Sequence, residues 1–133
     1  MLARIADPTL RVYFVWEPVL ETDTLAAARK SAATVVDRRV EHYWDEGLRL
    51  GHRVGEVLGL PTSEPPDRTS GLAWDVYLVY GAGERWWSGG AFPAPVAWWH
   101  QLDAVQVPQA PLLDDGSGLR RAVADALGHH PGG

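Results

Sequence analysis

Two segments rich in β-branched and aromatic residues constrain the fold of this chain more than any other feature. Residues 11–17 (Arg-Val-Tyr-Phe-Val-Trp-Glu) show little alternation between apolar and polar side chains, which is typical of a strand covered on both faces. Pro18 cannot donate a hydrogen bond to a neighbouring strand, so the strand should end near it. Residues 73–80 form the second segment, and Gly81-Ala82-Gly83 follow as a turn. We therefore expect a hairpin with its return strand over 84–87.

Two helices and a short strand are predicted between these segments. Thr22 or Asp23 is placed to cap a helix over residues 25–33. Residues 39–44 have the composition of a short strand, and a helix over 45–58 would then be capped by Asp45 and stopped by the glycine that follows it. One longer helix over both segments is the alternative. We prefer the short strand followed by a helix.

The rest of the chain is predicted to be mostly loop. Residues 61–71 and 88–95 are rich in proline and glycine, and residues 96–102 have room for one or two helical turns. A terminal helix is predicted to start at Asp114 or Asp115, because apolar residues then recur at every fourth position: Leu119, Val123 and Leu127. The predicted order is β-α-β-α-β-β-α, an α/β sandwich with a mixed sheet.

Length and composition favour one folded domain over residues 1–133, with a lead-in at 1–9, a Pro/Trp-rich connection at 88–113 and a frayed tail at 129–133. Hydrophobic residues make up 46% and charged residues 22%, which excludes a disordered chain. The net charge of −5 argues against a nucleic-acid partner. Apolar runs are too short for a membrane span, and charged residues interrupt any secretory signal, so we expect a cytoplasmic protein. The absence of cysteine excludes disulfides and thiol catalysis within these residues.

The predicted order of elements resembles the thioredoxin fold. Residues 73–86 are similar to its hairpin, residues 45–58 to the helix before the hairpin, and residues 118–128 to its terminal helix. The resemblance implies a thioredoxin-like domain with a mixed sheet.

The chain also departs from that family. No Cys-x-x-Cys is present, and Gly71-Leu72-Ala73 stands where the family has a cis-proline. In one alignment the strand over 11–17 is the second strand of the fold, and residues 1–9 are the end of a first helix. The chain would then be an N-terminally shortened thiol–disulfide oxidoreductase whose cysteines lie upstream of Met1.

Tryptophans next to a proline-rich segment suggest a binding groove. The chain has seven tryptophans, and four of them lie close in sequence to residues 92–95 (Phe-Pro-Ala-Pro). Aromatic rings held by prolines can line a rigid groove for a small apolar ligand or a peptide. The predicted groove residues are Trp86, Trp87, Trp98, Trp99 and His100. The alternative is that these rings pin a long loop to the sheet.

Two residues are candidates for acid–base chemistry, Asp75 and His100. On a strand over 73–80, covered on both faces, Asp75 would be desolvated, and burial favours the protonated form of a carboxyl group. The alternative places Asp75 at the end of the strand, where it accepts hydrogen bonds. The leading hypothesis is a non-redox thioredoxin-like binding or interaction module, possible as a homodimer. A small acid–base enzyme that uses Asp75 or His100 is the alternative from a different class.

Two further clusters of polar residues are candidate sites. Glu17, Glu21 and Asp23 follow the first strand, and ligands of α/β proteins bind beyond the carboxyl ends of strands. These carboxylates are also favourable at a helix N-terminus. A second cluster has residue types that suit a metal, but an arginine stands among them, so we expect neither a metal nor a cofactor: His42, Asp45, Glu46, His52 and Glu56.

Overall fold

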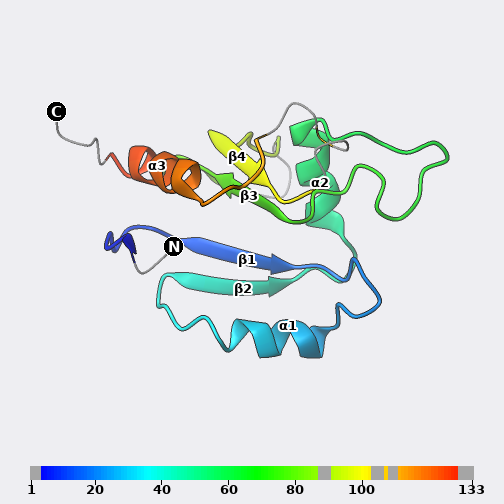
Figure 1. Cartoon of the computed structure of the whole chain (residues 1–133), viewed down its shortest axis with the longest axis horizontal. Helices are drawn as coiled ribbons and strands as arrows, with labels where there is room; N and C mark the ends of the chain where they lie inside the picture. Colours follow the sequence, from blue (N-terminus) through cyan, green and yellow to red (C-terminus); the bar gives the residue numbers. More distant parts are fainter. Residues whose placement is uncertain (1–3, 87–90, 103–106, 108–110, 129–133) are drawn as a thin grey trace.

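Seven helices and strands make up the fold in the computed structural model, which describes residues 4–86, 91–102, 107 and 111–128. They are β1 (Val12–Trp16), α1 (Leu25–Ala32), β2 (Val40–Trp44), α2 (Arg49–Leu58), β3 (Val76–Val79), β4 (Ala97–His100) and α3 (Ser117–Ala126). The predicted order β-α-β-α-β-β-α is confirmed, and the protein is of the mixed α/β class (Figure 1). Within the described residues, no helix has the length and apolar composition needed to span a bilayer.

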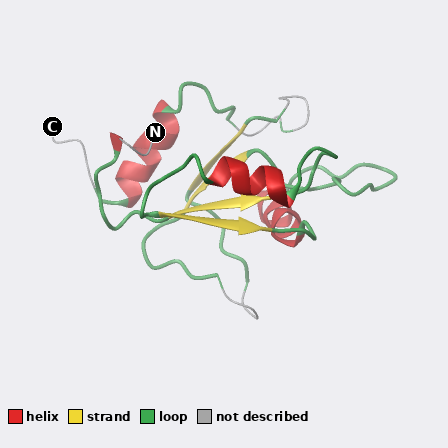
Figure 2. Ribbon diagram, turned by 90° about the horizontal axis from the view of Figure 1, so that it is seen from below, coloured by secondary structure: helices red, strands yellow, loops and turns green. Residues whose placement is uncertain are grey.

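The first half of the chain forms a parallel pair of strands with a helix on one face. β1 and β2 run parallel, with Trp16 opposite Trp44 at their carboxyl ends. α1 connects the two strands and lies over the pair (Figure 2). Ala28 is buried on the sheet side of α1. Because its side chain is small, α1 can approach the sheet closely.

Thr24 is the N-cap of α1. Its backbone is extended, and its hydroxyl accepts a hydrogen bond from the N–H of Ala27 at 3.1 Å. The prediction that Thr22 or Asp23 caps this helix is therefore wrong by one or two positions. The carboxylate of Asp23 instead accepts the N–H of Leu20 at 2.7 Å and holds the turn before the helix.

Replacement of Thr24 with alanine is expected to lower the free energy of unfolding by about 1 kcal/mol, because the N–H of Ala27 loses its acceptor. Urea denaturation measures the change. Thr22→Ala, at an exposed position two residues earlier, is the control and should change stability by less than about 0.5 kcal/mol. Equal effects of the two substitutions would contradict the assignment of Thr24 as the cap.

A short strand followed by a helix occupies residues 40–58, as predicted, and the single longer helix is wrong. Asp45 does not start α2, but its carboxylate accepts the N–H of Leu50 in the first turn at 2.6 Å. Leu48, just before the helix, is buried and has a left-handed backbone with φ of 56°. Gly59 ends the helix in the left-handed conformation, as predicted, with φ of 65°.

Two glycines let α2 pack closely against the segment that leads to β3. Gly51 and Gly55 are both buried, one helical turn apart. A methyl group on Gly55 would lie 1.7 Å from the carbonyl oxygen of Gly71. The carbonyl of Gly51 accepts the N–H of Ala73 at 3.0 Å. Backbone packs directly on backbone at this contact.

The second strand of the antiparallel pair is not where the sequence predicts it. β3 pairs with β4 at residues 97–100, whereas residues 84–86 are not a strand, and Trp87 lies outside the described residues. The predicted helical turn over 96–102 is also wrong. β4 (Ala-Trp-Trp-His) shows no polar alternation because both of its faces are covered, and a short apolar run of this kind does not distinguish strand from helix.

α3 covers one face of the β3–β4 pair and completes the core. Val79, Leu119 and Val123 are buried together, so the predicted apolar positions of the terminal helix are confirmed. Trp99 packs against the same cluster, close to Gly118 of α3.

The predicted single mixed sheet is wrong for the described residues. Among them, β1 pairs with β2 and β3 with β4, which gives two two-stranded sheets. Each pair has its own covering helix, α1 for the first and α3 for the second (Figure 1). The short strands of four or five residues are therefore stabilised mainly by these helices.

Candidate functional site

The residues of the predicted tryptophan groove do not share one surface where the structure describes them. Trp98 and Trp99 are neighbours on β4, so their side chains point to opposite faces of the sheet. Trp99 belongs to the core beneath α3, and Trp98 lies beside His100, with 6.0 Å between ring centroids. His100 is fully buried.

Trp86 belongs to a separate aromatic cluster. Its ring lies 5.1 Å from that of Tyr80 and 4.9 Å from that of Phe92. Burial raises the pKa of Tyr80 to about 12, and Glu84 adds to the effect. These contacts fit the alternative in which aromatic rings fix the long connection between β3 and β4. Trp87 lies outside the described residues.

Asp75 is exposed, so the expectation of a desolvated carboxylate at this position is wrong. β3 begins one residue later, at Val76, and Asp75 has a left-handed backbone with φ of 52° at the entrance to the strand. Its carbonyl accepts the N–H of Gln101 at 2.9 Å. Asp75 therefore has a structural role in joining β3 to the end of β4.

The metal-compatible side chains lie apart. Among the described residues, no three histidine or carboxylate side chains gather as metal ligands would. His42 instead accepts the indole N–H of Trp16 at its Nδ1 atom, at 3.2 Å, and stacks on Phe14 with 5.2 Å between ring centroids. Glu56 forms an ion pair with Arg53 at 2.9 Å.

The structure brings two carboxylates together at the carboxyl ends of the parallel strands. Glu17 follows β1 and Asp45 follows β2, and the N–H of Asp45 donates to the carbonyl of Trp16 at 2.9 Å. Both strands point toward α2 (Figure 1), whose Gly51 N–H donates to the carboxylate of Glu17. This end of a parallel sheet is where α/β proteins bind their ligands.

The carboxyl group of Glu17 has a raised pKa. Burial, and to a smaller extent the negative charge of Asp45, raise the pKa of Glu17 from 4.5 to about 7, against the opposing effect of the hydrogen bond from Gly51. Near neutral pH both forms of this carboxyl are populated. A carboxyl group in this state can accept or donate a proton, or change its charge, at physiological pH.

Gly51 makes this arrangement possible. A methyl group at position 51 would lie 2.3 Å from Oε1 of Glu17 and 2.6 Å from Cδ1 of Leu72. No larger residue leaves room for the carboxylate beneath α2. The glycine thus serves both the helix packing and the position of Glu17.

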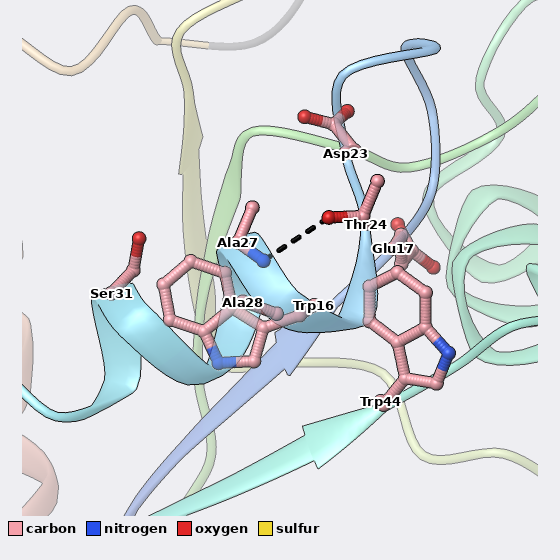
Figure 3. A pocket seen from close by; sticks show the side chains of 8 residues that line it. All are labelled: Trp16, Glu17, Asp23, Thr24, Ala27, Ala28, Ser31 and Trp44. Atoms are coloured by element: carbon pink, nitrogen blue, oxygen red, sulfur yellow. Dashed lines mark hydrogen bonds between the residues drawn. The ribbon is translucent and has the colours of Figure 1, made fainter.

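A small cavity of about 100 Å³ lies beside Glu17, between α1 and the ends of β1 and β2. Figure 3 shows the indoles of Trp16 and Trp44 on either side of the first turns of α1, with the Glu17 carboxylate close to Trp44. The lining residues are Trp16, Glu17, Asp23, Thr24, Ala27, Ala28, Ser31 and Trp44. Aromatic walls and carboxylates thus surround the cavity, and none of these eight described residues is basic.

Two of the residues that line this cavity were predicted from the sequence as members of a candidate site. Glu17 and Asp23 belong to the acidic cluster predicted after the first strand, whereas Glu21 is exposed and does not line the cavity. Trp16 and Trp44 were not among the predicted binding residues. Their signal is a tryptophan followed by an acidic residue at the end of both parallel strands, Trp-Glu and Trp-Asp.

The fold and site together define an α/β protein with an ionisable, aromatic-walled cavity at the carboxyl ends of two parallel strands. Comparison of the chain with family models, curated proteins and solved structures finds no match. A functional assignment therefore depends on the chemistry of the site itself.

Proposed function

We propose that this chain is a cysteine-free, thioredoxin-like binding module that holds a small organic cation between Trp16, Trp44 and Glu17. One observation carries the proposal: a carboxyl group with a pKa of about 7 lies beside a cavity walled by two indoles. The thioredoxin-like part of the proposal rests on the element order β-α-β-α-β-β-α alone, because the described strands form two separate pairs and not one mixed sheet. The proposal thus replaces the predicted groove with a site at the other pair of strands, and the predicted small apolar ligand or peptide with a small organic cation.

A cation fits this cavity better than a neutral or anionic group. The faces of indole rings carry negative electrostatic potential and attract ammonium groups at distances up to about 6 Å. Glu17 and Asp23 add carboxylate oxygens, and Ser31 adds a hydroxyl group. The volume of about 100 Å³ limits the bound part of the ligand to a small head group, such as a methylated ammonium.

Binding is expected to depend on pH through Glu17. A cation is attracted by the ionised carboxylate, and Glu17 ionises as the pH rises through about 7. The affinity for tetramethylammonium should therefore rise roughly tenfold between pH 5.5 and 8.5, measured by isothermal titration calorimetry. In Glu17→Gln the affinity should be low and independent of pH.

Two controls make this test specific. tert-Butanol has a similar shape without the charge and should not bind, and Trp86→Phe, in the separate aromatic cluster, should bind tetramethylammonium as the parent does. Trp44→Leu should weaken binding about tenfold or more, because a cavity wall is lost. No saturable binding, or an unchanged pH dependence in Glu17→Gln, would contradict the proposal.

Acid–base catalysis is the second candidate, and the pKa of Glu17 favours it at this residue over Asp75 or His100. A carboxyl group that titrates near pH 7 is suited to act as general acid or base. The neighbouring Asp45 carboxylate would help to keep the proton on Glu17. The thiol hypothesis stays a prediction, since these 133 residues contain no cysteine.

A further inference from the structure

A second hollow lies at the opposite, amino-terminal end of the parallel strands. It has a volume of about 120 Å³ and is lined by Pro8, Arg11, Arg38, Arg39 and Glu41. Three of these five lining residues are arginines and one is a glutamate, in a chain whose net charge is −5. A concentration of positive charge on an acidic protein indicates a site for an anion.

Arg39 forms a rigid part of this hollow. Its guanidinium makes two hydrogen bonds to Asp37, Nη2 to Oδ2 at 2.6 Å and Nε to Oδ1 at 2.9 Å, and Nη1 donates to the carbonyls of Ile5 and Asp7. These bonds lower the pKa of Asp37 to about 2. Arg39 therefore fixes the lead-in segment against the start of β2.

Arg11 and Arg38 supply the accessible charge. Both are exposed, and among the described residues neither forms an ion pair. Nη1 of Arg11 donates to the carbonyls of Pro8 and Leu10 at 2.8 and 2.9 Å, which orients its guanidinium at the rim of the hollow. The charge of Arg38 makes the smallest of the contributions that lower the pKa of Asp37, so this guanidinium can still contact an incoming anion.

An exposed pair of tyrosines lies on the same face of the β1–β2 sheet. Tyr13 is the second residue of β1 and Arg11 directly precedes the strand, so the two side chains share a face where the extended backbone continues through Arg11. Tyr13 and Tyr43 are 52% and 51% exposed, with 6.2 Å between ring centroids. The hydroxyl of Tyr43 donates to Oε2 of Glu41 at 2.7 Å, which ties one oxygen of that carboxylate to the tyrosine pair.

We propose that this face binds a small anion attached to a planar aromatic ring, of the chemical class of a nucleoside monophosphate. Arg11 and Arg38 contact the phosphate, and Tyr13 stacks on the ring. Aromatic side chains beside arginines are a common way to hold a base and its phosphate together. The site is at the far end of the strands from Glu17 and does not depend on the cation cavity.

Isothermal titration calorimetry with AMP, adenosine and inorganic phosphate tests this proposal on the full chain. AMP should bind at least tenfold more tightly than either adenosine or phosphate, because only AMP reaches both the arginines and the tyrosine. Arg38→Gln should weaken AMP binding about tenfold. The control Arg53→Gln removes an exposed arginine on α2 and should leave AMP binding unchanged.

The ring contact is tested separately. Tyr13→Ser should weaken AMP binding to about the level of inorganic phosphate and leave phosphate binding unchanged, with the circular dichroism spectrum retained. The proposal is overturned if AMP does not saturate the protein, if adenosine binds as tightly as AMP, or if Arg38→Gln and Arg53→Gln bind AMP equally.

Discussion

Replacement of Gly55 with alanine is expected to destabilise the fold by roughly 2–4 kcal/mol. The new methyl group would lie 1.7 Å from the carbonyl oxygen of Gly71, so α2 or the segment before β3 must shift. Alanine favours a helix over glycine by about 1 kcal/mol, which offsets only part of this cost. Because small domains have total stabilities of about 5–15 kcal/mol, thermal and urea denaturation will detect the loss readily.

Gly81→Ala is the matched control for this substitution. A methyl group at position 81 meets no atom within 4 Å, and Gly81 is not among the glycines with positive φ. Its stability should match that of the parent or exceed it by less than about 1 kcal/mol. If Gly55→Ala were as stable as Gly81→Ala, the close contact between α2 and Gly71 would be wrong.

The ionisation of Glu17 is expected to make the protein less stable as the pH rises from about 4.5 to 7. The folded carboxyl keeps its proton up to a pKa of about 7, whereas the unfolded carboxyl loses it near 4.5. Within this window the folded state binds more protons, so raising the pH favours unfolding. Above pH 7 both states are ionised and the effect is constant.

The size of this effect follows from the shift and from the partial exposure of the side chain. A shift of this size corresponds to about 3 kcal/mol, and we reduce it to about 1–2 kcal/mol because Glu17 is only half-buried. Urea denaturation of the parent and of Glu17→Gln at pH 4.5, 5.5, 7 and 8 isolates the contribution of Glu17 to the free energy of unfolding. Glutamine keeps the shape of the side chain and can accept the Gly51 N–H. A stability difference between the two proteins that stays constant over this range would contradict the raised pKa.

The sequence predicted the order of elements but not all of the strand partners. β1, β2 and the three helices lie close to where capping residues, glycine stops and apolar spacing place them. The partner of β3 was missed because Gly81-Ala82-Gly83 is a strong turn signal, while the tryptophans of β4 lack alternation. Whether β3 pairs with a strand as far along the chain as β4 depends on which elements cover the two faces of that pair. One face is covered by α3, which lies later in the sequence.

The candidate site was harder to predict from the sequence, because its properties also depend on contacts between distant parts of the chain. The acidic residues after the first strand were noted, but the raised pKa of Glu17 depends on burial beneath α2 and on Asp45, almost thirty residues away. The absence of a side chain at Gly51 is equally necessary and carries no chemical signature of its own. Strand periodicity over 73–80 places Asp75 inside the sheet, but β3 starts three residues later than predicted, at Val76, which leaves Asp75 in solvent.

The two glycines of α2 give this helix little intrinsic stability. Each glycine in a helix interior costs about 1 kcal/mol relative to alanine, so α2 is ordered mainly by its contacts with Glu17, Leu72 and the chain near Gly71. Local opening of α2 would hydrate the Glu17 carboxyl and remove the cause of its raised pKa. Proton binding at Glu17 and closure of α2 are therefore linked: each favours the other, and ionisation lowers the free energy needed to open this one helix.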